Sequence, residues 1–293
     1  MQKKLLLLIF ILFFYGCSKN QKEELLLSTN SWIGYSPLFY AKEMGYLDEL
    51  NIELIPTVSL GESLNLFLVS KADMLTGTQH EYNLLHQEMH SVVPIVLFDR
   101  SDGGDMILSN RTLQELKNLH KSQKIDVYLE VDSVNKEMIE HFIKHSHLSK
   151  KSMHFINKDQ AQIQNIISKD ENPTIIVTYA PYNVLLEKKG FIPIASTKDI
   201  NTLLVIDALF TSKKTLQQNK KRFENLKRVI DNSIHEIQKD PHEAYKRVSK
   251  YLNEISYEEF EISLQTIKWI NKPSEELLRK INTSIYSTQS LIK

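Results

Sequence analysis

The chain has 293 residues, and its 36 basic and 36 acidic side chains give a formal net charge of zero. A balanced charge excludes the basic field that draws a protein to nucleic acid without regard to sequence. The hydrophobic fraction of 42% is ordinary for a globular protein, and the length suffices for one large domain or two medium ones. We therefore expect a small-molecule partner and no nucleic acid.

The N-terminus is typical of a secretion signal. Lys3 and Lys4 precede an apolar run over residues 5–15, and Gly16 and Cys17 follow it. This run is too short to cross the roughly 30 Å of hydrocarbon in a bilayer as a permanent helix. We expect residues 1–16 to be a signal peptide that is removed.

Cys17 is the only cysteine of the chain, so no internal disulfide can form. Its position, after a small residue at the end of the apolar run, resembles the lipobox cysteine of bacterial lipoproteins. The resemblance implies a diacylglycerol anchor on Cys17, with residues 17–24 as anchor and tether. The alternative is a plain signal peptide with an incidental cysteine.

From Leu25 onward, short apolar runs alternate with amphipathic stretches, which is typical of strand and helix units that build parallel sheets. Before Gly103 the pattern predicts strands at residues 25–29, 51–57, 72–77 and 92–98, and helices near 37–44, 62–69 and 80–87. After Gly104 it predicts strands at 105–109, 124–130, 153–157, 174–179, 191–195 and 203–212, and helices at 134–145 and 161–168. Four helices then follow, near residues 223–238, 242–252, 257–270 and 274–282.

Two apolar runs that contain acidic residues bracket the middle of the chain, at residues 95–105 and 203–210. We interpret them as crossovers between two lobes that face each other across a cleft. Lobe one comprises residues 25–100 and 208–293, and lobe two comprises residues 101–207. The alternative, a single doubly wound sheet, is disfavoured because single cores stop growing near about 250 to 300 residues.

Ligands of parallel α/β sheets bind beyond the carboxyl ends of the strands, where helix N-terminal amides are free. Four predicted loops lie at such ends, at residues 30–35, 76–80, 130–133 and 178–181. In the first loop, Trp32 and Tyr35 are placed to stack on a ligand, with Ser36 as the cap of the helix and Pro37 as its first residue. The alternative for Trp32 is ordinary packing at a lobe edge.

Glu130 ends an apolar strand, so its carboxylate must bond nearby amides or a ligand donor, and we favour the ligand. Thr78 and Gln79 contact a ligand or form an ordinary N-cap cluster. Asp99 and Asp105 flank two glycines in a pattern typical of a turn, without the spacing of a calcium-binding EF-hand loop.

Metal and catalytic motifs are weak. His141 and His145 are spaced i, i+4 on a predicted helix, but no Glu follows His141, and a solvated helix face is favoured over a metal site. The sequence has no G-x-S-x-G elbow, no Walker loop and no G-x-G-x-x-G. We expect no catalytic residue, no metal and no cofactor.

Three strings occur in a specific order: WIGYSPLFYAKEMGYL at residues 32–47, SLGESL at 59–64 and KADMLTGT at 71–78. Together they resemble the first lobe of the nitrate/sulfonate/taurine and thiamine-pyrimidine substrate-binding proteins of ABC importers. LFDRSDGGDMIL at 97–108 is similar to the crossover of that family, and VTYAP at 177–181 to a strand end of its second lobe. The resemblance implies a type II periplasmic-binding-protein fold: two α/β lobes, two crossover strands, C-terminal helices on lobe one and a hinge that closes over a small ligand.

The family motifs map onto specific candidate ligand contacts in this chain. These are Trp32, Tyr35, Thr78, Ser101, Asp105, Glu130, Ser133 and Tyr179, to which we add Gln79 and Asp207 from their place near the cleft. The sequence EVDS at 130–133 lacks the small Gly-Ser loop of anion-binding members. With acids at the cleft and Arg100 as the evident cation, we expect an uncharged, amine-bearing or heteroaromatic solute that contains nitrogen or sulfur.

The resemblance implies an extracytoplasmic, lipid-anchored protein, periplasmic or on the cell surface, that captures a small molecule and presents it to an ABC permease. The alternative is a ligand-sensing adaptor whose closed form contacts a membrane signalling protein, and the sequence does not separate the two. Fungal pyrimidine synthases share this fold but carry a cysteine-rich motif. Because this chain has Cys17 alone, we do not expect an enzyme.

Overall fold

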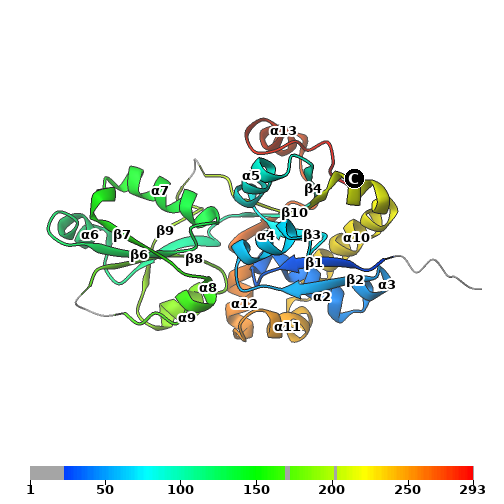
Figure 1. Ribbon diagram of the computed structural model, residues 1–293. Helices are drawn as coiled ribbons and strands as arrows, with labels where there is room; N and C mark the ends of the chain where they lie inside the picture. The colour runs from blue at the N-terminus through cyan, green and yellow to red at the C-terminus, as the bar shows by residue number, and fades with distance from the viewer. Residues whose placement is uncertain (1–22, 169–171, 201–202, 293) are drawn as a thin grey trace, which may run out of the picture.

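The computed structural model describes residues 23–168, 172–200 and 203–292, and Figure 1 shows two α/β lobes side by side. Lobe one contains a six-stranded sheet with the order β11-β4-β10-β3-β1-β2, and lobe two a five-stranded sheet with the order β7-β6-β8-β5-β9. The predicted two-lobed α/β fold is confirmed. The predicted signal peptide and Cys17 lie outside the described residues.

The ten predicted strands are all present. Lobe one contains β1 (Leu25–Thr29), β2 (Ile52–Pro56), β3 (Met74–Gly77), β4 (Val92–Ser101), β10 (Ile206–Ser212) and β11 (Ile267–Trp269). Lobe two contains β5 (Asp105–Ser109), β6 (Ile125–Leu129), β7 (Met153–Asn157), β8 (Thr174–Tyr179) and β9 (Ile192–Ser196). The sheets are mixed and not purely parallel, because the crossover strands run back: β10 is antiparallel to β3 and β4, and β5 to β8 and β9.

Helices connect most of the strands. In lobe one they are α2 (Ser36–Glu43), α3 (Tyr46–Glu49), α4 (Leu60–Leu68), α5 (Gln79–Glu88), α10 (Lys213–Lys239), α11 (Pro241–Val248), α12 (Tyr257–Leu264) and α13 (Glu275–Ser284). In lobe two they are α6 (Leu113–Leu119), α7 (Val134–Ser146), α8 (Gln160–Ile163) and α9 (Asn183–Lys188). Short 3₁₀ turns occur at Ile33–Tyr35, Lys150–Ser152 and Ser249–Tyr251. No helix in these described ranges is long and apolar enough to cross a membrane.

Three local predictions were wrong. The helix expected over 257–270 ends at Leu264, and β11 then pairs with the edge of β4, a long-range partner that local periodicity does not reveal. The helix expected over 161–168 ends at Ile163, and just beyond it the Asn165 side chain bonds the Ala161 carbonyl. Ser36 is not the cap of α2, because the 3₁₀ turn runs directly into the helix and the Ser36 hydroxyl donates to the Ile33 carbonyl oxygen at 2.6 Å.

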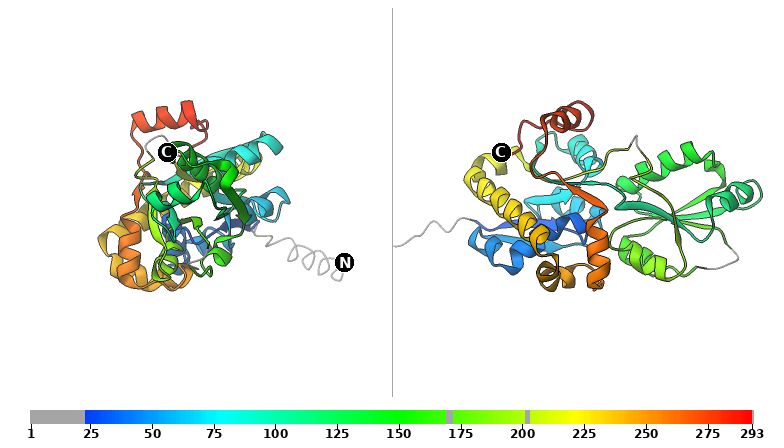
Figure 2. Two further views of the ribbon diagram at one scale, coloured as in Figure 1. Left: turned by 90° about the vertical axis from the view of Figure 1, so that its left-hand side faces the viewer. Right: turned by 180° about the vertical axis from the view of Figure 1, so that it is seen from behind.

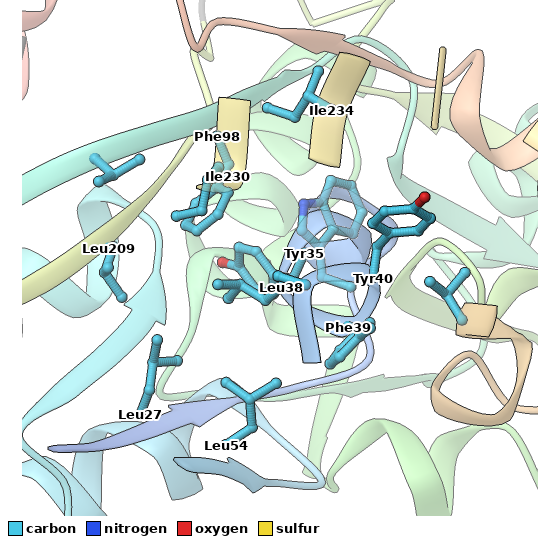
Figure 3. Packing of buried hydrophobic residues seen from close by; sticks show 14 of the residues in the cluster. Leu27, Tyr35, Leu38, Phe39, Tyr40, Leu54, Phe98, Leu209, Ile230 and Ile234 are labelled. Atoms are coloured by element: carbon cyan, nitrogen blue, oxygen red, sulfur yellow. The ribbon is translucent and has the colours of Figure 1, made fainter. Parts of the chain in front are cut away.

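Both faces of the lobe-one sheet are covered. On one face, Leu27 and Leu54 of the sheet pack with Leu38 of α2 and with Ile230 and Ile234 of α10, as Figure 3 shows. On the other face, residues of α4, α5 and α13 pack against the sheet. The predicted placement of the C-terminal helices on lobe one is thus confirmed, and Figure 2 shows α12, in orange, at the boundary with lobe two.

The strand pairing shows where the chain passes between the lobes. Ile206 and Asp207 pair with Arg100 and Asp99 of β4, so they belong to the lobe-one sheet, two residues before the expected boundary at 207/208. Ser101 also pairs within this sheet, with Ile267 of β11. The chain therefore passes between the lobes within residues 102–104 and again between β9 and β10.

Arg222 of α10 holds the start of the first strand in place. Its guanidinium donates to the carbonyl oxygens of Leu50, Asn51 and Glu23 at 2.6, 3.0 and 2.8 Å, and the residue is 4% exposed. Hydrogen bonds from a charged donor are among the stronger ones, and here the donor itself is buried, so its three acceptors offset the cost of burying its charge.

We expect Arg222→Ala to lower the free energy of unfolding by about 2 to 4 kcal/mol, because three charge-assisted hydrogen bonds and the packing of a buried side chain are lost. Urea unfolding measures the change. Arg228→Ala on the exposed side of the same helix is the matched control and should change the free energy by less than about 0.5 kcal/mol. Equal effects of the two substitutions would contradict the anchoring role of Arg222.

Candidate functional site

A small cavity lies between the lobes, and we call it the interlobe cavity. Its lining residues are Asn30, Trp32, Tyr35, Leu60, Thr78, Asp105, Val134, Tyr179 and Asp207. Six of the ten predicted ligand contacts therefore meet at one place. They come from the carboxyl ends of β1, β3 and β8 and from the crossover strands β5 and β10, where α/β proteins place their ligands.

The two lobes are nearly in contact across this cavity. The volume of the cavity is about 10 Å³. That is room for about one water. An organic solute can therefore enter only when the lobes move apart.

On the lobe-one side, aromatic donors are bonded to buried acids. The Trp32 indole nitrogen donates to Asp99 Oδ2 at 3.4 Å, and the Tyr35 hydroxyl donates to Asp207 Oδ1 at 2.5 Å. Thr78 caps α5 in a reciprocal arrangement in which its hydroxyl and its amide both donate to Glu81 Oε2, at 2.6 and 2.8 Å. The acids thus fix the orientation of the side chains that line the cavity.

Two glycines allow Trp32 to lie against the crossover. A Cβ added to Gly34 would lie 1.9 Å from Asp99 Oδ2, and one added to Gly104 would lie 2.4 Å from Trp32 Cη2. Both distances are far below van der Waals contact, so any larger residue would displace the indole ring or the acid. The close approach explains why glycines are needed here.

Contacts across the cleft hold the lobes together. Asn30 Nδ2 donates to the Tyr179 hydroxyl at 2.8 Å, and the rings of Trp32 and Tyr179 meet edge to face at 5.9 Å. At the rim, His80 Nδ1 of α5 lies 2.9 Å from Glu137 Oε1 of α7. Lys188 Nζ of α9 lies 2.6 Å from Glu259 Oε1 of α12, which adds an ion pair between the lobes.

Four buried carboxyl groups lie at or near the cavity. Asp105 and Asp207 line it, and Asp99 and Glu81 lie behind the lining on the side of lobe one. Burial, together with repulsion from Asp99 and Asp105, holds the pKa of Asp207 well above its usual range, and burial does the same for Asp99. Burial raises the pKa of Asp105 to about 6 and also raises the pKa of Glu81. These acids repel one another and are costly to ionise without a counter-charge.

The other four predicted contacts lie outside the cavity. Ser101 Oγ lies 2.8 Å from Thr197 Oγ1 and accepts from the Asp105 amide at 3.0 Å, which ties the two crossovers together. Gln79 Oε1 accepts from the Ile206 amide at 3.2 Å. Ser133 Oγ accepts from the Asn135 amide and caps α7.

Glu130 lies in a second opening of the cleft, which we call the acidic mouth. Its volume is about 380 Å³, and its charged lining residues are Glu62, Glu130, Asp132, Lys158 and Asp159. Glu130 Oε1 accepts from the Gln160 amide at 3.0 Å, and burial raises the pKa of Glu130 to about 8.

A third and larger opening, of about 510 Å³, shares Asn30 with the interlobe cavity. Phe39 and Tyr251 line it and stack with ring centroids 4.7 Å apart, so we call it the aromatic mouth. Its volume is typical of a small-molecule site, and it adjoins the interlobe cavity at Asn30. Gln164 and Leu185 supply its lobe-two side.

Sequence reasoning missed Asn30 and misplaced Asp99. Asn30 directly follows β1, and this position at a strand end was the available signal. Asp99 was interpreted as an acid of the turn, but it is fully buried within β4, and Asp102 is the acid of the turn. Arg100, the expected cation of the cleft, pairs with Asp102 at 3.3 Å and does not line the interlobe cavity.

The histidines at 141 and 145 stack with ring centroids 5.9 Å apart on α7. Within the described parts of the chain, no group of three or more His, Cys, Asp and Glu side chains is placed to hold a metal ion.

We expect the free energy of unfolding of the unliganded protein to fall as the pH rises from 6 to 8. The folded-state pKa of Glu130, about 8, is above its unfolded value of about 4.5. Between these values the folded protein holds a proton on Glu130 that the unfolded chain has released, so raising the pH lowers the free energy of unfolding. Urea unfolding at several pH values measures the slope. Glu130→Gln, which keeps an oxygen acceptor for the Gln160 amide, should reduce the loss by about 1 to 2 kcal/mol; an unchanged slope would contradict the assignment.

Comparison with known proteins places these features in a family. The model of the NMT1/THI5-like family matches residues 32–244. None of the curated proteins matches the chain.

Several solved structures are similar in fold. The ligand-binding component of an ABC-type import system from Staphylococcus aureus, solved with zinc bound, has a TM-score of 0.70 at 13% identity, over 89% of this chain and 92% of that one. The alkanesulfonate-binding protein from Xanthomonas axonopodis, bound to MOPS, has a TM-score of 0.70 at 11% identity, over 89% and 90%. The periplasmic nitrate-binding protein from Synechocystis has a TM-score of 0.66 at 13% identity, over 80% and 68%.

At these identities the structures show the fold alone, which is the periplasmic-binding-protein fold with the strand order β2-β1-β3-β10-β4 in lobe one. The family match shows more than the fold, because it spans most of the chain and begins at Trp32 of the site. The chain belongs to the NMT1/THI5-like family.

Proposed function

We propose that this protein is an extracytoplasmic solute-binding protein of an ABC importer, which captures a small molecule between its lobes and delivers it to a membrane permease. The observation that carries the proposal is the interlobe cavity, because its lining comes from both lobes at the ends of their strands. Proteins of the same fold include the ligand-binding component of an ABC-type import system, an alkanesulfonate-binding protein and a periplasmic nitrate-binding protein.

The geometry supports capture by lobe closure. A solute that contacts Trp32 and Thr78 of lobe one and Tyr179 of lobe two at once stabilises the closed arrangement relative to the open one. The hinge lies where the two connections meet, because Thr197 just after β9 contacts Ser101 and the Gly103 amide, each at 2.8 Å. Binding and release then need a lobe movement and no covalent chemistry.

We also propose that Cys17 carries a lipid anchor and that residues 17–24 form a tether. Lobe one begins with β1 at Leu25, and Figure 1 shows that this strand starts on the side of the molecule away from lobe two. An anchor attached there leaves the cleft free to open and close.

Lobe closure is expected to change the fluorescence of Trp32, because the indole lies in the cleft and is 4% exposed when the lobes are closed. The chain has two tryptophans, so Trp269→Phe isolates the signal of Trp32. We would titrate residues 18–293 of this variant with taurine, alkylsulfonates, nitrate, polyamines, betaines and purines. A captured solute should shift the emission to shorter wavelength and reduce the radius of gyration in X-ray scattering.

The control for this measurement is Trp32→Phe, which retains Trp269 and should give no emission change with the same solute. If no solute changes emission or radius of gyration, and native mass spectrometry of the purified protein finds no bound molecule, the proposal of solute capture is contradicted.

The lipid anchor makes a separate prediction for the full-length chain expressed in a bacterium. Wild-type protein should be recovered with the membrane fraction and should incorporate a labelled fatty acid, whereas Cys17→Ser should lose the label, since the serine hydroxyl cannot form the thioether. Equal labelling of both forms would contradict an anchor at Cys17.

A further inference from the structure

The interlobe cavity has hydrogen-bond acceptors that lack donors. Asn30 Oδ1 and Asp105 Oδ2 line the cavity on residues that are 2% and 4% exposed, and within the described residues they accept no hydrogen bond. Behind the lining, Asp99 Oδ1 and Glu81 Oε1 are also buried without a hydrogen-bond donor. Buried polar atoms nearly always have partners, so these oxygens indicate where a ligand supplies donors.

Most hydrogen-bond donors of the same cavity already have an acceptor. The Trp32 indole donates to Asp99, and the Tyr35 hydroxyl donates to Asp207. The Thr78 hydroxyl donates to Glu81, and the Asn30 amide nitrogen donates to Tyr179. The cavity therefore presents vacant acceptors, whereas most of its donors are engaged and the Tyr179 hydroxyl, which accepts from Asn30, keeps its own proton. This balance favours a ligand rich in N–H groups over an anion.

The ionisable residues of the cavity also favour a cation over an anion. Asp105 and Asp207 line the cavity, whereas none of its lining residues, all of which lie in the described ranges, is Lys, Arg or His. The acidic mouth adds four carboxyl groups against one lysine. Burial raises the pKa values of Asp105, Asp207 and Glu130, and a bound cation would offset the cost of ionising them.

Closure brings like charges together across the cleft. Glu81 of lobe one acts by repulsion on Asp105 and on Glu130, which lobe two supplies. A positive charge bound between the lobes would offset this repulsion in the closed form only. The flanking Trp32 and Tyr179 rings supply faces and edges against which a flat cation can pack.

The geometry points to a small organic cation with several N–H donors, such as an amidine, a guanidine or a diamine, as the solute bound between the lobes. This inference rests on the proposed function, because it names the chemical class of the captured solute. It places the donors against Asn30 Oδ1 and Asp105 Oδ2, with the positive charge near Asp207.

The test uses three probes that share a phenyl ring and differ in charge: benzamidine, benzamide and benzenesulfonate. Their dissociation constants for residues 18–293 are measured by calorimetry at equal ionic strength. Benzamidine should bind at least about tenfold more tightly than benzamide, as expected when N–H donors meet a charged acceptor, and benzenesulfonate should bind most weakly.

Asp105→Asn preserves the side-chain shape and removes the charge, so the preference for benzamidine over benzamide should fall to about twofold or less. Its unfolding midpoint without ligand reports whether the variant is folded. Glu53→Gln, an exposed acid on β2, is the matched control and should keep the full preference.

The outcomes separate this inference from the proposed function. Tightest binding of benzenesulfonate, or equal binding of benzamidine and benzamide, would overturn the cation class while leaving solute capture in place. Stabilisation by Zn²⁺ or Mg²⁺ that displaces benzamidine would overturn it in favour of a metal ion. Failure of all three probes to bind would also overturn it, and solute capture would then be judged by the Trp32 closure measurement alone.

Discussion

The antiparallel pairing of β4 with β10 is the constraint on which the rest of the structure depends. These two strands lie between β3 and β11 in the lobe-one sheet, and both continue into the connections to lobe two. Their register places Asp99 directly opposite Asp207, and the register shifts between Asp207 and Ala208. The same backbone pairing therefore joins the lobes and sets two buried acids side by side beneath the cleft.

A pair of like charges opposite each other in a sheet is unfavourable, and burial adds to the cost. The structure reduces that cost with donors from the first loop, because Trp32 bonds Asp99 and Tyr35 bonds Asp207. The acids in turn orient the two rings toward the cleft. The aromatic residues and the acids thus form one unit. Burying the acids lowers the stability of the fold, and the hydrogen bonds that they accept make the wall of the site rigid.

The strands and helices could largely be predicted because they rest on local periodicity, and the family resemblance added the order in which they form two lobes. Features that depend on distant partners could not be predicted in this way. The strand β11 exists because β4 offers it an unpaired edge, and Asp99 was taken for a turn residue because nothing near it in the sequence shows that β10 lies opposite. Asn30 and Tyr179 are 149 residues apart, so their hydrogen bond had no local signal.

Closure and selectivity are linked by the way that the acids are divided between the lobes. Asp99, Asp207 and Glu81 belong to lobe one, whereas Asp105 and Glu130 belong to lobe two. Without a counter-charge, bringing the two sets together requires protonation or repulsion, and both oppose the closed form. A solute that supplies positive charge and donors removes this opposition, whereas an anion would increase it. The free energy that selects the solute is then the same free energy that stabilises the closed form, so a solute of the wrong charge leaves the lobes without that stabilisation.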